Sequence, residues 1–148
     1  MIAFENTERV AMPPVELPLL RRWLGEVARR HGFDCGDLSY RFCNDEEILD
    51  ANRQFLGHDY FTDIITFDYS REDIIAGDML ISLDTVGSNA KLIGATPWRE
   101  LHRVIVHGLL HLCGINDKGP GEREVMERHE DEALRLLDEM GYQERVMP

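Results

Sequence analysis

The sequence predicts a small α+β domain in which one mixed sheet of three to four strands packs among about five helices. Two patterns predict this class. Apolar residues recur at helical spacing in five segments, and three shorter segments alternate in polarity or are rich in β-branched residues. The length of 148 residues and the 43% share of hydrophobic residues suit one hydrophobic core. We therefore expect a single domain over residues 1–148.

The first elements follow a stretch of mixed pattern that ends at two prolines. Apolar residues at positions i, i+3, i+4 and i+7, from Leu20 to Val27, predict an amphipathic helix over residues 17–31. A turn is expected over residues 34–37. The alternating segment 38–42 then predicts a strand.

The middle of the chain predicts one helix and two further strands. Asn44 is a good N-cap, and Glu47 stands in capping-box position for a helix over residues 45–55. Residues 63–69 are β-branched and aromatic, which predicts a strand in the centre of the sheet. After a turn-rich link, residues 78–83 predict a third strand.

The last third of the chain predicts three helices. The first covers residues 84–93, with Asp84 as its cap. Thr96 as N-cap, followed by proline, begins the second, over residues 97–113. Apolar residues at helical spacing predict the third, over residues 122–140.

Composition and charge restrict the classes of function. The net charge of −12 disfavours non-specific binding of nucleic acid or anionic membrane by the surface as a whole. Three cysteines without a CxxC pair favour a reducing cytoplasm, and no segment is typical of a signal peptide or membrane span. Arg21, Arg22, Arg29 and Arg30 line one helix, either as a solvated face or as a strip for an anionic ligand.

The strongest chemical signal is the segment HGLLHLCGIND, residues 107–117. His107 and His111 stand four positions apart, so on a helix their imidazoles share one face. Gly114 allows the chain to fold back, which would bring Asp117 to the same point. Burial of two imidazoles in an apolar segment is costly without partners, and a metal ion removes that cost. The pattern predicts a metal site formed by His107, His111 and Asp117.

Several motifs resemble those of one known family. Residues 107–114 match H-G-x-L-H-L-x-G at every fixed position, residues 52–67 match N-x-x-[FY]-x-x-x-D-x-x-T-[DN]-[VI]-[LI]-[ST]-F, and residues 77–79 match G-D-[IM]. The chain thus resembles, over about residues 38–141, the YbeY family of bacterial rRNA maturation factors, which are metal-dependent endoribonucleases. HExxH metalloproteases differ in having glutamate directly after the first histidine, where this chain has Gly108.

The resemblance implies a function and a setting. It implies a cytoplasmic endoribonuclease that cleaves single-stranded RNA during ribosomal RNA maturation, including the 16S 3′ end. It implies one zinc ion (Zn2+) per chain, held by the three ligands of the signature on a helix that lines a cleft beside the sheet. Ribosomal RNA and the small ribosomal subunit are the implied partners, and no membrane is involved.

Two positions depart from the family pattern. The third histidine of the signature is Asp117 here, an acceptable zinc ligand that reduces the net positive charge of the ion. The arginine that usually follows the aromatic residue of the upstream motif is Leu56 here. Arg53 and Arg103 are the candidates to replace that cation, although each is also suited to an ordinary surface or core-edge position.

Other polar residues near the motifs have simpler interpretations. Asp63 is expected to form a strand-edge hydrogen bond or to contact a metal ligand, and Glu100 to serve as a cap or turn residue. His129 is expected to be a hydrogen-bonded core residue, His31 and His58 to lie at the surface, and Cys113 to be structural.

The sequence therefore predicts a zinc-dependent endoribonuclease whose catalytic residues remain unassigned. The nucleophile is either water or a 2′-hydroxyl of the RNA activated by the metal, and the sequence does not decide between them. Two alternatives remain open. One is a zinc hydrolase of amide or ester bonds, and the other is a ribosome-assembly factor that keeps a structural zinc and cuts no RNA.

Overall fold

The computed structural model describes residues 1–144 of the chain. Within these residues four strands and five helices form, which confirms the predicted α+β class. In chain order the elements are β1 (Ile2–Asn6), α1 (Leu17–Arg30), β2 (Asp34–Cys43), α2 (Asp45–Leu56), β3 (Ile64–Asp68), β4 (Ile74–Ser82), α3 (Leu83–Ile93), α4 (Pro97–Leu112) and α5 (Glu122–Glu139).

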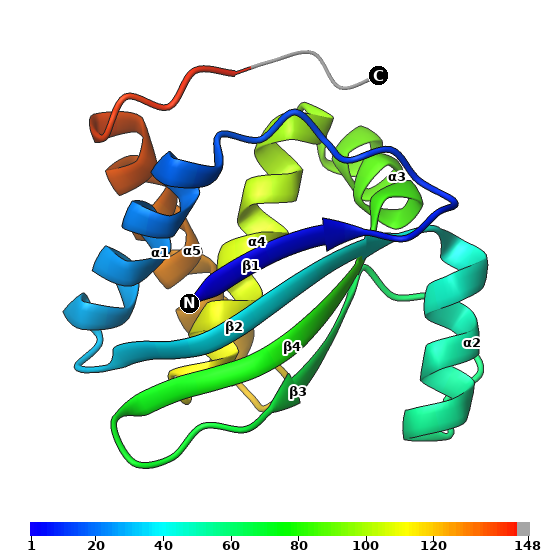
Figure 1. Cartoon of the computed structure of the whole chain (residues 1–148), viewed down its shortest axis with the longest axis horizontal. Coiled ribbons are helices and arrows are strands. Elements are labelled where there is room, and N and C mark those ends of the chain that lie inside the picture. The colour runs from blue at the N-terminus through cyan, green and yellow to red at the C-terminus, as the bar shows by residue number, and fades with distance from the viewer. Residues whose placement is uncertain (145–148) are drawn as a thin grey trace.

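The four strands form one mixed sheet in the order β1-β2-β4-β3. β1, β2 and β4 are parallel, and β3 runs antiparallel to β4. Figure 1 shows α1, α4 and α5 together behind the sheet, with α2 at the end where β2 and β4 finish. On the opposite face from α4, Ile48 of α2 packs with Ile65 of β3 and Cys43.

Helix α4 is the element around which the core is built. Tyr40 of β2 donates its hydroxyl hydrogen to the carbonyl of Ile105 at 2.9 Å, which fixes α4 beneath the middle of the sheet. Trp23 of α1 donates to the carbonyl of Ala133 in α5 at 2.7 Å, so the two outer helices are joined across the core. Because α4 is enclosed in this way, the backbone that carries its open face is held in a fixed position.

The segment predicted as a central strand lies at the edge of the sheet, and that prediction is wrong. β3 pairs only with β4 among the described strands. The segment is apolar because both faces of β3 are covered by other elements. Ile64 packs with the main core on the α4 side, and Ile65 packs with α2 on the other side. Burial of both faces produces a continuous apolar run whether or not a strand is central.

Two strands begin earlier than predicted because glycines that suggest turns instead sit in the sheet. A Cβ on Gly77 would come within 2.5 Å of the carbonyl oxygen of Phe67, and one on Gly36 within 3.0 Å of that of Ile75. Glycine therefore marks close approach of neighbouring strands here. The predicted turn over residues 34–37 and part of the predicted link are consequently strand.

Two further local predictions need correction. The short edge strand β1 was missed because only Ile2 is fully buried, so the strand lacks a clear alternating pattern. Helix α3 is capped by Ser82 rather than Asp84, since the helix follows β4 without a loop. The carboxylate of Asp84 instead accepts a hydrogen bond from the backbone N–H of Asp45, at the start of α2.

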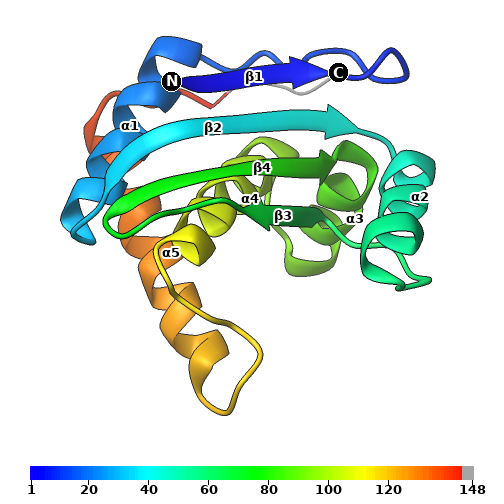
Figure 2. The ribbon, with the colours of Figure 1, turned by 60° about the horizontal axis from the view of Figure 1, so that its bottom comes forward.

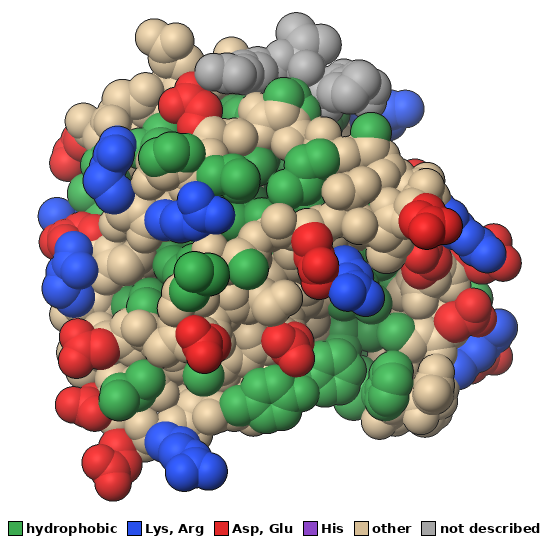
Figure 3. Space-filling view, viewed as in Figure 1, with side chains coloured by type: hydrophobic (Ala, Val, Ile, Leu, Met, Phe, Trp, Pro, Cys, Tyr) green, Lys and Arg blue, Asp and Glu red, His purple; other side chains and the backbone are tan. Residues whose placement is uncertain are grey.

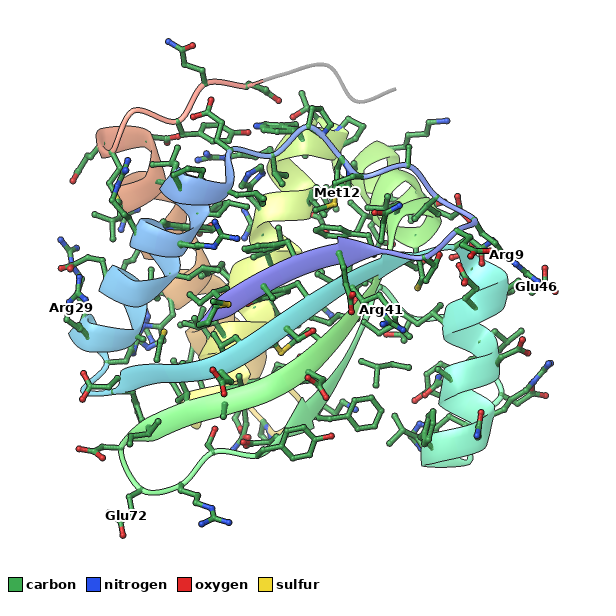
Figure 4. The ribbon with its side chains drawn as sticks, in the orientation of Figure 1. Arg9, Met12, Arg29, Arg41, Glu46 and Glu72 are labelled. Atoms are coloured by element: carbon green, nitrogen blue, oxygen red, sulfur yellow. The ribbon has the colours of Figure 1, made fainter. Side chains whose placement is uncertain are left out.

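Three of the four arginines of α1 form ordinary surface contacts rather than a free basic strip. Arg29, at the outer end of α1 in Figure 4, and Arg30 both pair with Glu26, and Arg21 donates to the carbonyl of Ile2. Arg9 and Glu46, labelled in the same figure, join the segment after β1 to α2 at 3.1 Å. No helix formed by residues 1–144 combines the length and apolar character that crossing a lipid bilayer requires.

Candidate metal centre

Helix α4 presents the two histidines of the signature on one face. The helix begins as predicted, with Thr96 accepting a hydrogen bond from the N–H of Arg99 and proline in its first turn. Gly108, between the histidines, faces the sheet instead. A Cβ there would lie 2.8 Å from Ile64 Cδ1 and 3.0 Å from Met79 Cγ. Contact with the sheet thus explains why this position is glycine rather than a catalytic glutamate.

The turn after α4 brings the third predicted ligand back to the histidines. Gly114 adopts a φ of +88°, and the N–H of Ile115 donates to the carbonyl of Leu110 at 3.1 Å, which closes the end of the helix. The segment between α4 and α5 then passes on the β3 side of the sheet (Figure 2). Asp117 lies in this segment.

The side chains of His107, His111 and Asp117 converge on one point. One ligand atom from each lies within 4.8 Å of the others. The Nε2 atoms of His107 and His111 are each 3.4 Å from a different oxygen of Asp117. In the view of Figure 3 no histidine side chain of the described residues is visible at the surface. The structure therefore brings together all three residues that the sequence singles out, in an arrangement that could hold a metal ion.

Glu130 of α5 is a functional residue that the sequence reasoning missed. Its Oε2 lies 2.6 Å from Nδ1 of His107, and the residue is only 5% exposed. With Nδ1–H donating to this carboxylate, Nε2 of His107 is left to face Asp117. A signal was present in the sequence, because Glu130 occupies a core-spaced position between Met126 and Ala133 on the apolar side of α5.

The two histidines have opposite electrostatic environments. Burial works to lower the pKa of His107, but the hydrogen bond and charge of Glu130 outweigh it, so the pKa is raised. Burial, together with the charge of His107, lowers the pKa of His111. Burial also raises the pKa of Asp63, which stands beside His107.

The two arginines expected to replace the cation lost at Leu56 are both occupied. Arg103 contacts three carboxylates, those of Glu130 at 3.1 Å, Asp131 at 3.2 Å and Glu100 at 3.6 Å. Glu100 is thus a buried partner of Arg103, not the cap or turn residue that the sequence suggested, and burial raises its pKa.

The other candidate cation, Arg53, donates from Nε to Asp59 and lies 4.0 Å from Asp50. Its contacts are therefore confined to the exposed end of α2. Neither arginine offers a free positive charge to a ligand at the histidines.

Two hollows meet at the histidine cluster. One, of about 760 Å³, extends from the cluster between α3 and α5, past Leu92, Arg103 and Arg123. The other, of about 660 Å³, extends along β3 past Leu56 and Thr66. Four residues line both: Asp63, His107, Asp117 and Lys118. An extended ligand lying in both hollows would therefore pass directly over the cluster.

The remaining histidines lie outside this site. His129 is not the hydrogen-bonded core residue that was expected, because no group of residues 1–144 forms a hydrogen bond with its Nδ1, and its ring meets that of His31 edge-on at 4.9 Å. His58 is exposed, as predicted, and stacks on Tyr60. Cys113 is buried, in agreement with a structural role.

The fold and the cluster together define a small α+β domain that carries a candidate metal centre on a buried helix. A family model described as Endoribonuclease YbeY matches residues 5–138. The chain belongs to this family, which confirms the resemblance indicated by its motifs.

Individual relatives agree with this assignment. The chain is 56% identical over 137 residues to the Endoribonuclease YbeY of Phocaeicola vulgatus, covering 93% of this chain and 99% of that protein. It is 54% identical to that of Parabacteroides distasonis, covering 89% and 93%. Among solved structures, it resembles TM1509 from Thermotoga maritima with a TM-score of 0.59 and 26% identity, over 95% of this chain and 94% of the other.

Proposed function

We propose that this chain is a zinc-dependent endoribonuclease that cleaves single-stranded RNA during ribosomal RNA maturation. The observation that carries the proposal is the convergence of His107, His111 and Asp117 at the junction of two hollows. Membership of the endoribonuclease YbeY family supports RNA as the substrate. We further propose that it acts in the cytoplasm on the small ribosomal subunit, at the 3′ end of 16S RNA.

The donor set of the cluster fits zinc. Two imidazole nitrogens and one carboxylate oxygen are a ligand set that catalytic zinc sites use, with a fourth position left open for substrate. His107 and His111 would each contribute Nε2, and Asp117 an oxygen. When bound, zinc supplies a Lewis acid that stabilises negative charge developing on phosphate oxygens.

The residues around the cluster prepare it for this role. Glu130 holds the proton of His107 on Nδ1, so Nε2 of that ring is available as a ligand. Arg103 in turn fixes Glu130 by contacting its other oxygen. The hollows on either side accept an extended chain, which suits a polymer cut at an internal bond.

Product analysis tests this function against its alternatives. The zinc-loaded protein is incubated with a single-stranded RNA spanning a 16S 3′ end, with a duplex RNA and with pools of peptides and esters. We expect cleavage of the single-stranded RNA only, and loss of at least 100-fold in rate for His111→Ala, because one of three ligands is missing. His58→Ala, at the exposed surface, is the control.

Two results would contradict the proposal. Cleavage of the peptides or esters in place of RNA would identify a hydrolase of amide or ester bonds. If no substrate is cut, and His111→Ala loses zinc and thermal stability together, the result would support the alternative of a ribosome-assembly factor with a structural zinc.

A further inference from the structure

Cleavage of RNA at the cluster requires a positive charge to meet the substrate phosphate, and the surroundings of the cluster are acidic. Asp63, Glu100, Glu130 and Asp131 all line the larger hollow with His107. Leu56, which carries no charge, lines the smaller hollow. Any side-chain cation that pairs with the phosphate beside the metal must therefore come from another residue.

Three lysine or arginine residues line the hollows among the described residues: Arg103, Lys118 and Arg123. Arg103 is held by three carboxylates. Arg123 pairs with Glu127 at 3.2 Å, one turn further along α5. For Lys118, by contrast, no ion pair or hydrogen bond forms within residues 1–144, and its side chain is exposed.

The position of Lys118 places its charge at the cluster. It directly follows Asp117, and it is the one lysine or arginine of the described residues that lines both hollows. A flexible lysine beside the cluster is thus free to follow a phosphate in either hollow.

We propose that Lys118 is the cation that contacts the RNA phosphate at the metal centre. This inference rests on the proposed function and names the residue that binds the substrate. It also accounts for the charge of the site. The carboxylate of Asp117 brings one negative charge to the cluster, and the neighbouring lysine offsets it.

The chain contains only two lysines, Lys91 and Lys118, which provides a matched control. Lys91 is exposed on α3 and lines neither hollow, so Lys91→Gln makes the same change in net charge away from the site. The variants to compare are Lys118→Gln, Lys118→Arg and Lys91→Gln. Zinc content is measured for each, and we expect it to be unchanged.

Two measurements test the contact. We expect Lys118→Gln to lower kcat/KM for single-stranded RNA by roughly 10- to 100-fold through loss of a charged hydrogen bond, and Lys118→Arg to restore most of it. Affinity for a 2′-O-methyl RNA, which does not need to be cut, is then measured against salt concentration. The slope of log affinity against log salt should fall by about 0.7 in Lys118→Gln, the value for one phosphate contact on a single strand.

The inference is overturned if Lys118→Gln and Lys91→Gln show the same salt slope and the same kcat/KM as the unmodified chain. Failure of the proposed function gives a different result, in which the unmodified chain cuts no RNA. The salt slope does not depend on cleavage, so it decides the role of Lys118 in binding in that case too.

Discussion

At the scale of single residues, the candidate centre depends on which nitrogen of His107 carries a proton. The 2.6 Å contact with Glu130 assigns that proton to Nδ1 and leaves Nε2 as the ligand atom. Oriented imidazoles bind metal more tightly because the ring does not have to be fixed when the ion arrives. A carboxylate 23 positions away thus determines what the HxxxH pattern can do.

Replacement of Glu130 tests this arrangement. We expect Glu130→Gln to weaken zinc binding by about 10- to 100-fold, since an amide is a weaker acceptor for Nδ1–H and leaves Arg103 without one of its carboxylates. Zinc affinity is measured by competition with a chelator. Glu139→Gln, at the exposed end of α5, should leave that affinity unchanged. Equal zinc affinities for the two variants would show that Glu130 does not orient His107.

The sequence predicted the three candidate ligands because they lie within one short segment. Two histidines four positions apart share one face of a helix, and a glycine after them allows the chain to turn back. Both effects depend only on residues close together in the sequence. The role of Glu130 depends on how α5 packs against α4, and so do the ion pairs of Arg103 with Glu130 and Asp131. Such long-range contacts leave only an indirect trace in the sequence, here an acid at a core-spaced position of α5.

At the scale of elements, helices were predicted more accurately than strands. The capping box of Asn44 and Glu47 and the cap at Thr96 form as expected, because each involves residues three positions apart. The limits of β2 and β4 are set by pairing between distant segments. Glycine is common in turns, yet Gly77 lies within β4, where the neighbouring strand β3 leaves no room for a side chain.

The same close approach connects the fold to the site. Gly108 lets α4 lie against β3 and β4, and this contact holds His107 and His111 at the edge of the sheet where the two hollows meet. The glycine and the histidines of the signature thus serve different purposes. The glycine sets the position of the helix, and the histidines provide the chemistry.

At the scale of the whole molecule, the burial of α4 makes stability depend on pH. His102 is 1% exposed and its Nδ1 lies 2.7 Å from the carbonyl oxygen of Trp98. Burial lowers the pKa of His102 to about 4. Between pH 6.5 and 4 the unfolded chain therefore binds a proton that the folded chain does not, so stability falls as the pH falls through this range and is unaffected by His102 above it.

The expected effect of His102 is a loss of about 3 kcal/mol in the free energy of unfolding between pH 6.5 and pH 4. Urea unfolding of the metal-free protein across this range measures it. His102→Gln should show a clearly shallower pH dependence, and His58→Gln, which changes an exposed histidine, should match the unmodified chain. An unchanged slope in His102→Gln would show that this buried imidazole is not the group responsible.

The proposed activity requires that His107, His111 and Asp117 hold a single divalent ion. Elemental analysis of the purified protein, after dialysis against a fixed low concentration of free zinc, tests it most directly. We predict one zinc per chain for the unmodified protein and for Asp73→Ala, which changes an exposed acid, and almost none for Asp117→Ala. One zinc per chain retained in Asp117→Ala, or none in the unmodified protein, would contradict the account.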